Sequence, residues 1–228
     1  MKFIETKRII FVLAINFLIL GSITCNYPLK TLYVDSGNFD VRKLTARNLE
    51  VKCASNQVLQ GFHLTRNAAG NTFAYEYKCL SHKAVGTKTK AITNTYTLVG
   101  NEDRATHFLD RQTVECPVGY GIQSFRLEEQ NNQLRYLYNC IEVNTRTCKD
   151  KENTYTEANK ENQVIYLDKQ NVIVGENEFL RNFKLYSANS KYSYKYNFCD
   201  AVELIKPVPK QPTFLKRNSD NPPIAKKL

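Results

Sequence analysis

A six-residue phrase occurs three times in this chain and constrains its fold more than any other feature. The copies read LQGFHL, IQSFRL and LRNFKL, and their phenylalanines, Phe62, Phe125 and Phe183, are separated by 63 and 58 residues. Self-similarity at a fixed period identifies a repeat architecture, in which each copy is one structural unit. The chain is therefore expected to contain three related units of about 60 residues.

The first two copies align over a longer stretch than the phrase itself. A cysteine stands nine residues before the phenylalanine in both, at Cys53 and Cys116, and a tyrosine stands twenty residues before that cysteine, at Tyr33 and Tyr96. The third copy has Val174 where the cysteine would stand.

Each phrase is followed by a polar turn and a second shared string, YEYKC, YLYNC or YKYNFC. Two alternating segments around a polar turn predict a β-hairpin. In the first segment Phe62 and Leu64 should face the core while His63 faces solvent, because side chains alternate along a strand. The extra residue before Cys199 in the third copy predicts a β-bulge there.

The fold class that follows is all-β, with three disulfide-linked hairpin repeats in approximate threefold symmetry, resembling a β-prism or a β-trefoil. We place the repeats at about 30–82, 93–148 and 162–204, within a single domain at 26–205. With 14 Tyr and 12 Phe, the chain has enough large side chains to fill a core of this size.

The cysteines predict an oxidising compartment and three bridges. Six remain if Cys25 is removed with a leader, and an even set suits disulfides. Cys53 and Cys79 should meet because one begins a hairpin strand and the other ends its partner, and the same reasoning pairs Cys116 with Cys140 and leaves Cys148 for Cys199. No metal site is expected, since these cysteines form no CxxC pair and the three histidines are scattered.

Residues 1–25 are predicted to be a signal peptide. Basic residues precede the apolar run IIFVLAINFLIL, which is 12 residues long and therefore shorter than the roughly 20 residues of a membrane-spanning helix. The protein is expected to be secreted, and to be extracellular or associated with the cell surface.

Most of the positive charge lies outside the predicted domain. Without the leader, 29 basic residues stand against 21 acidic ones, a net charge of +8, and the Pro-rich segment 206–228 carries +5 of it. We expect this segment to be a flexible basic tail. Because a secreted chain does not meet nucleic acid, the basic excess indicates acidic glycans or an anionic surface as partners, or serves solubility alone.

Three basic residues, His63, Arg126 and Lys184, occupy the same position in the three phrases and are expected to face outward. If the repeats surround an axis, they would form a ring of positive charge. They are our candidate ligand-binding residues; the alternative is that they are solvated surface groups.

Reactive motifs are missing from the sequence, which has no HExxH, GxSxG, GxxxxGK[ST] or GxGxxG. The carboxylate pair Glu128 and Glu129 is expected to diverge in a hairpin rather than to flank a substrate. We therefore expect no catalytic residues, no cofactor and no enzymatic activity.

The segment KCASNQVLQGFHLTRNAAGNTFAYEYKC resembles the repeat of the dermatopontin family, which consists of small secreted, Tyr-rich, disulfide-bonded matrix and lectin-like proteins. The resemblance covers roughly residues 50–200. The family's Asp-Arg-x-Trp signature is missing, and Tyr75, Tyr136 and Tyr194 stand where its Trp is expected. The resemblance implies adhesion, with glycans or proteoglycans as partners.

We therefore expect a non-enzymatic extracellular adhesion protein that recognises acidic glycans, proteoglycans or cell-surface proteins. One alternative is a structural coat protein that assembles with other proteins or forms a homo-oligomer. A second is a secreted inhibitor or effector acting through a rigid exposed loop, for which the 28-residue segment from Ser81 to Phe108 is the candidate.

Overall fold

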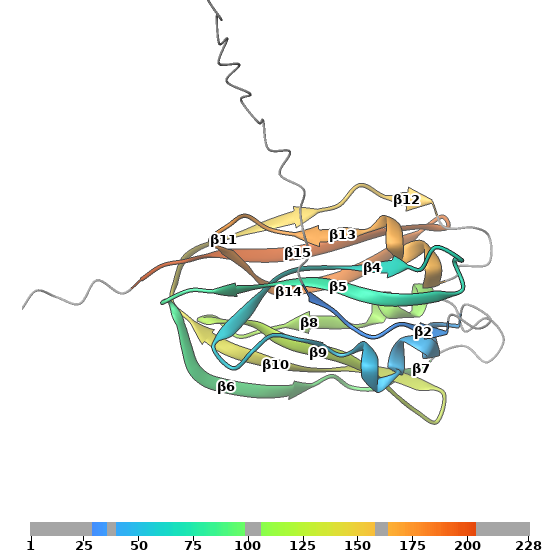
Figure 1. Cartoon of the computed structure of the whole chain (residues 1–228), viewed down its shortest axis with the longest axis horizontal. Coiled ribbons are helices and arrows are strands. Elements are labelled where there is room, and N and C mark those ends of the chain that lie inside the picture. Colours follow the sequence, from blue (N-terminus) through green and yellow to red (C-terminus); the bar gives the residue numbers. More distant parts are fainter. Residues whose placement is uncertain (1–28, 36–39, 99–105, 158–163, 204–228) are drawn as a thin grey trace, which may run out of the picture.

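The computed structural model describes residues 29–35, 40–98, 106–157 and 164–203, and these form an all-β structure with short 3-10 helices (Figure 1). The predicted signal peptide and the predicted basic tail lie outside the described residues. Within the described ranges no helix is long and apolar enough to cross a membrane.

The strands form three antiparallel sheets of five strands each, which we name A, B and C. Sheet A contains β1 (Leu29–Lys30), β2 (Val34–Asp35), β4 (Gln57–Arg66), β5 (Thr72–Ser81) and β13 (Asn171–Ile173). Sheet B contains β3 (Val51–Lys52), β6 (Val85–Thr93), β7 (Thr97–Leu98), β9 (Tyr120–Gln130) and β10 (Gln133–Val143). Sheet C contains β8 (Thr113–Glu115), β11 (Thr145–Glu152), β12 (Thr156–Glu157), β14 (Glu178–Ala188) and β15 (Lys191–Ala201). The 3-10 helices are η1 (Val41–Thr45), η2 (Arg47–Leu49), η3 (Thr106–Arg111) and η4 (Val164–Lys169).

A hairpin forms the centre of every sheet, as the repeats predict: β4–β5, β9–β10 and β14–β15. The second and third hairpins close on two-residue turns, Asn131–Asn132 and Asn189–Ser190, whose φ angles are all between 50° and 60°. Positive φ at both central residues is what type I′ turns require, and these turns match the twist of the flanking strands.

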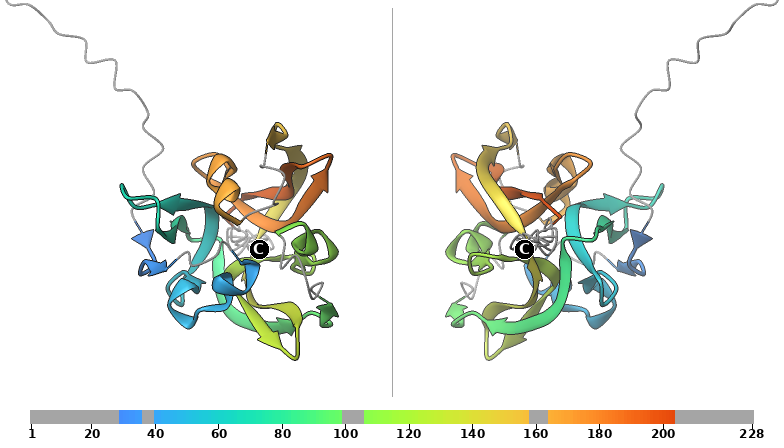
Figure 2. Two further views of the ribbon diagram at one scale, coloured as in Figure 1. Left: turned by 90° about the vertical axis from the view of Figure 1, so that its right-hand side faces the viewer. Right: turned by 90° about the vertical axis from the view of Figure 1, so that its left-hand side faces the viewer.

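Each repeat gives a short strand to the sheet of the next repeat. The strand before the first hairpin pairs with the second hairpin, the strand before the second pairs with the third, and the strand before the third pairs with the first. The equivalent register pairs are Val51 with Phe125, Val114 with Phe183, and Val172 with Phe62. The repeats are thus joined in a closed cycle, and Figure 2 shows the three sheets around a common centre.

A tyrosine hydroxyl forms a hydrogen bond across each seam, the line along which two sheets meet. The acceptor is always a backbone carbonyl of the short exchanged strand. The pairs are Tyr77 to Lys52 at 3.2 Å, Tyr138 to Glu115 at 3.1 Å, and Tyr196 to Ile173 at 3.4 Å. The first of these bonds links sheet A to sheet B.

The three phrase phenylalanines meet at the centre of the core. Their ring centroids are 4.9 Å (Phe62–Phe125), 4.8 Å (Phe62–Phe183) and 5.0 Å (Phe125–Phe183) apart. Each is at most 2% exposed, as the alternation predicts. Two of these contacts are edge-to-face and the Phe62–Phe183 contact is tilted. Aromatic contacts of this kind add stability beyond the burial of apolar area.

Three equivalent tyrosines, Tyr75, Tyr136 and Tyr194, pack around this triangle. Each touches two of the phenylalanines at centroid distances of 5.6 to 6.1 Å. Burial raises the pKa of all three phenols above the usual value of 10. These tyrosines are core residues and are not exposed for ligand contact.

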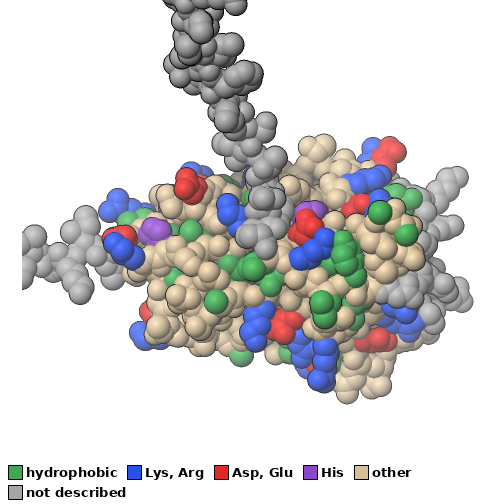
Figure 3. Space-filling model, in the orientation of Figure 1, with side chains coloured by type: hydrophobic (Ala, Val, Ile, Leu, Met, Phe, Trp, Pro, Cys, Tyr) green, Lys and Arg blue, Asp and Glu red, His purple; other side chains and the backbone are tan. Residues whose placement is uncertain are grey.

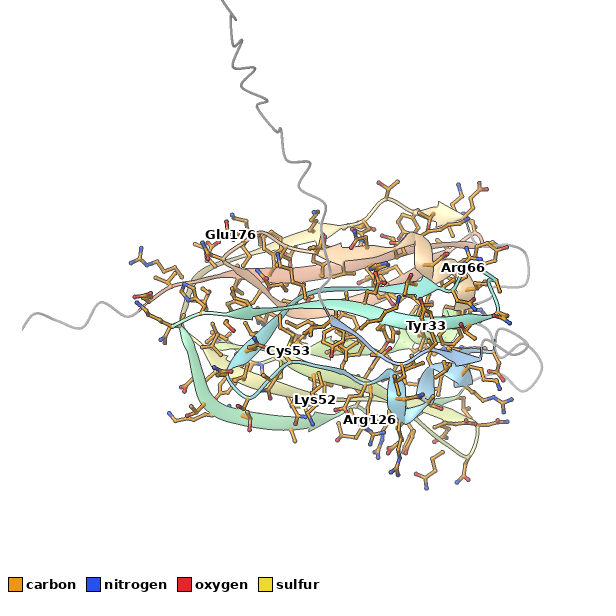
Figure 4. All side chains as sticks on the ribbon, in the orientation of Figure 1. Tyr33, Lys52, Cys53, Arg66, Arg126 and Glu176 are labelled. Carbon is orange, nitrogen blue, oxygen red and sulfur yellow. A yellow bond between two sulfur atoms is a disulfide. The ribbon has the colours of Figure 1, made fainter. Side chains whose placement is uncertain are left out.

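The structure forms three disulfides between the cysteines that the sequence paired. The reason given for the first pair was wrong, because Cys53 does not begin the first hairpin strand. It directly follows the short strand β3. Cys53–Cys79 therefore joins sheet B to sheet A, across a Cα–Cα distance of 5.8 Å, and does not close one hairpin (Figure 4). Cys116–Cys140 joins sheets C and B in the same way, at 5.7 Å.

The third disulfide differs from the other two. Cys148 and Cys199 are a cross-strand pair within sheet C, on β11 and β15. At the seam between sheets C and A, Val174 and Phe198 occupy the positions that hold cysteines in the other repeats, and both pack against the core. These two positions at that seam therefore carry apolar side chains in place of a disulfide.

The predicted bulge before Cys199 is in a different place. The register shift lies on the opposite strand, at Arg181, and the first two hairpins have the same shift at Gln60 and Gln123. All three bulged side chains donate to backbone carbonyls of an adjacent turn: Gln60 to Gly175, Gln123 to Ala54, and Arg181 to Cys116. Because of the extra residue in β15, Phe198 stands where the other two repeats have a cysteine. Cys199 lies one residue further on, opposite Cys148 of β11.

One further expectation about a segment needs correction. The proposed inhibitory loop from Ser81 to Phe108 contains the edge strand β6, which is paired with β10, together with β7 and the start of η3; residues 99–105 lie outside the described part. The strands β6 and β11 pair with the hairpins that follow them. They add residues from Val85 to the second repeat and from Thr145 to the third.

A second core layer shows how unequal residues fill equivalent positions. Val58, Gly121 and Phe179 each stand four residues before the phrase phenylalanine. A Cβ on Gly121 would lie 2.5 Å from Val58 Cγ2 and would also overlap the Phe179 ring. The glycine therefore makes room for the large phenylalanine of the third repeat.

Replacing Gly121 by Ala should destabilise the protein by about 1–3 kcal/mol, because an added methyl overfills the layer. Replacing Phe179 by Leu in the same chain should recover part of this loss, since the smaller side chain vacates the space. The measurement is a double-mutant cycle of denaturant unfolding. Simple additivity of the two changes would show that the residues do not compete for one space.

Candidate functional site

A groove on the outer face of sheet C has a volume of about 620 Å³. Its walls come from β8, β11, β14 and β15: Thr113, Asp150, Lys151, Glu152, Asn182, Lys184, Tyr186, Lys195 and Tyr196. Because Phe183 and Leu185 point into the core, the side chains between and beside them on β14 face this groove.

Lys184 and Lys195 are directly opposite each other on β14 and β15. Like charges in this position repel and lower stability. The ring of Tyr186 lies between them, with its centroid 5.1 Å from Lys184 Nζ and 4.5 Å from Lys195 Nζ. The face of an aromatic ring attracts cations, so the tyrosine offsets part of this repulsion.

Acidic side chains flank the lysine pair without neutralising it. Lys195 Nζ lies 3.3 Å from Glu152, and this hydrogen-bonded carboxylate raises the pKa of Lys195 above its usual value. Lys151 stands over the Tyr196 ring at 5.8 Å. With Asp150 included, the groove carries three cations and two anions next to aromatic surface. Such a surface can hold an anionic group by charge-assisted hydrogen bonds and a flat apolar face by contact with the ring.

The three candidate residues lie on three different sheets and do not form one site. Lys184 lies in the sheet C groove, and Arg126 lies on sheet B, 3.6 Å from Glu128 (Figure 4). His63 is on sheet A, 3.5 Å from Glu76, and burial lowers its pKa, which favours the neutral form at pH 7. All three face outward as expected, but on separate sheets.

Charge is mixed on the face that Figure 3 shows, where basic, acidic and apolar side chains are interspersed. The adjacent carboxylates Glu128 and Glu129 do diverge, since Glu128 binds Arg135 and Tyr96 while Glu129 lies 3.7 Å from Arg42. The hydrogen bond from Arg135 lowers the pKa of Glu128. Both carboxylates are used in surface ion pairs.

Lys195 and Tyr186 were not among the predicted site residues, although the sequence contains a signal for them. A two-residue turn at Asn189–Ser190 fixes the register of the hairpin and so places Lys195 opposite Lys184. Tyr186, two residues after Lys184, then shares its face.

Among the described residues, no group of three His, Cys, Asp or Glu side chains is placed to hold a metal ion. The disulfides indicate an oxidising, extracellular type of environment. Searches of protein-family models, curated proteins and solved structures found nothing that matches this chain.

Proposed function

We propose that this chain is a secreted, non-enzymatic binding protein that recognises acidic glycans through the groove on sheet C. The observation that carries the proposal is the cross-strand pair Lys184 and Lys195 around the Tyr186 ring. Neither of the other sheets has two cations at this position, since sheet A has His63 opposite Glu76 and sheet B has Arg126 opposite Leu137.

The chemistry of the groove suits a sulfated or carboxylated saccharide. Anionic groups of the sugar would accept charge-assisted hydrogen bonds from the lysines. The C–H face of a sugar ring would rest on Tyr186, which is half-buried and held by the lysines on both sides. The resemblance to the dermatopontin family, which implies glycans or proteoglycans as partners, agrees with this proposal and stays a prediction.

The architecture we propose for the binding scaffold is a β-prism with approximate threefold symmetry. Its support is the cyclic exchange of short strands and the nearly equal sides of the phenylalanine triangle. A prism is favoured over a trefoil because each hairpin lies at the centre of its own sheet.

The alternative of a self-assembling coat protein receives less support. Such assembly would use exposed sheet edges, but the edge strand β6 carries Lys88 and Lys90, and β11 carries Lys149 and Lys151, all exposed. Lysines on edge strands oppose pairing between molecules. Self-association without polysaccharide, measured over a range of protein concentrations, would favour the coat protein instead.

The double variant K184Q/K195Q should bind a sulfated polysaccharide such as heparin about tenfold more weakly or worse, because two charge-assisted contacts are lost. The wild type should elute from a heparin column only at raised salt, and the variant earlier. The variant Y186L should weaken binding without a change in charge, which separates ring contact from charge attraction.

The matched control is K83Q/K88Q, which removes two exposed lysines that also face single carboxylates, Glu203 and Glu142, at 3.5 Å. This control should elute close to the wild type. If K184Q/K195Q and the control eluted together and earlier than the wild type, total charge, and not the groove, would govern retention. If all three eluted together, neither would govern it, and the proposed site would be wrong in both cases.

A further inference from the structure

A second groove, of about 230 Å³, lies on the outer face of sheet B at the position that corresponds to the sheet C groove. Arg126 lines it where Lys184 lines the larger groove, since both follow the phrase phenylalanine directly. Ser124 and Asn139 also line it, and Asn139 Nδ2 donates to Ser124 Oγ at 2.9 Å.

The second groove differs from the first in its charge. The ion pair Glu152–Lys195 of sheet C is replaced in sheet B by the uncharged cross-strand pair Thr93 and Leu137. Ile92 and Leu137 give the groove an apolar wall, and Glu50 stands in it as an acceptor beside the donor Arg126. One cation and one carboxylate leave the groove without net charge.

At the corresponding position of sheet A, charged side chains pair with each other. Lys30 and Glu76 stand at the same cross-strand position and form an ion pair at 2.8 Å, and His63 lies 3.5 Å from the same carboxylate. The equivalent place therefore holds an ion pair in sheet A, a groove without net charge in sheet B, and a lysine pair in sheet C.

We infer that the groove on sheet B is a second saccharide site, and that it takes an uncharged sugar unit. Sugar hydroxyls can donate to Glu50 and accept from Arg126, while the C–H face of the ring lies against Ile92 and Leu137. This inference rests on the proposed function for the kind of ligand, and it makes the chain bivalent: one face holds an acidic glycan and another a neutral one.

The test transfers the ion pair of sheet A into sheet B. In the variant T93K/L137E, the new lysine and glutamate occupy the positions of Lys30 and Glu76. The control S55E/T87K adds the same charges at exposed positions outside the groove. Unchanged disulfide maps and melting temperatures show that each variant is folded.

The probe is an array of defined neutral and acidic oligosaccharides. The wild type and the control should bind members of both sets. T93K/L137E should lose neutral binding by about tenfold or more and keep acidic binding, because only the sheet B groove is blocked. K184Q/K195Q should show the reverse pattern.

Two results would overturn the inference: no neutral binding by the wild type, or neutral binding that T93K/L137E leaves unchanged. Loss of acidic binding in every form, with neutral binding intact and sensitive to T93K/L137E, would refute the proposed sheet C function while supporting the second site. The two proposals thus fail in distinguishable ways.

Discussion

Replacing any one of the central phenylalanines, Phe62, Phe125 or Phe183, by Ala is expected to lower the free energy of unfolding by about 3–5 kcal/mol. The rings touch each other at 4.8 to 5.0 Å and are at most 2% exposed, so each truncation opens a cavity where all three repeats meet. The three losses should be similar, because the three positions are equivalent. Denaturant unfolding of the three variants measures them.

The control for this series is Val118→Ala, since Val118 is 82% exposed and its truncation should change stability by no more than about 0.5 kcal/mol. If one of the three phenylalanine variants behaved like this control, that phenylalanine would not lie at the common centre. The repeats would then be packed in pairs and not as a group of three.

Removing the disulfide Cys116–Cys140 by the double variant C116A/C140A should cost about 2–5 kcal/mol, the second large effect we expect. The bridge joins two sheets and closes a loop of 24 residues, so its loss frees the unfolded chain and also loosens a seam. The comparison is made by denaturant unfolding without reductant. With reductant, the difference between variant and wild type should shrink, because the wild type loses the same bridge.

Partial reduction should separate the three bridges by access. Cys148 is exposed, whereas Cys53, Cys116 and Cys140 are at most 3% exposed. A limiting amount of reductant should therefore open Cys148–Cys199 first, as alkylation and peptide mapping would show. Earlier opening of Cys116–Cys140 would mean that the seam between sheets B and C is open in solution.

Local patterns were enough to predict the hairpins and their faces. The alternation of side chains along the strand separated Phe62 and Leu64 from His63. The polar turns lie between the two strings that each repeat shares. These features depend on residues that are near each other in sequence, which is why sequence shows them. The disulfide partners also followed, because the repeats place the cysteines alike.

The exchange of short strands could not be predicted in the same way. Val51, Val114 and Val172 align in the three repeats, but strands of two or three residues do not identify their partner sheet. Tertiary packing decides that choice. For the same reason Cys53 was placed on the first hairpin instead of on a strand of sheet B.

The edge strand β6 was missed for a different reason. Its sequence, VGTKTKAIT, is polar on both faces, because an edge strand outside the core buries little on either side. Such a segment reads as a loop until its partner is known. The candidate site was predicted only in part: Lys184 was identified, while Lys195 and Tyr186 needed the hairpin register.

An engineered disulfide can test whether the three repeats form a closed cycle. Val174 and Phe198 occupy the positions of the bridged cysteines of the other repeats, which have Cα–Cα distances of 5.8 and 5.7 Å. The variant V174C/F198C should form a fourth bridge that joins sheet C to sheet A, seen in a non-reduced peptide map with the three natural bridges retained. Free thiols at 174 and 198, or their pairing with Cys148 or Cys199, would contradict the cycle.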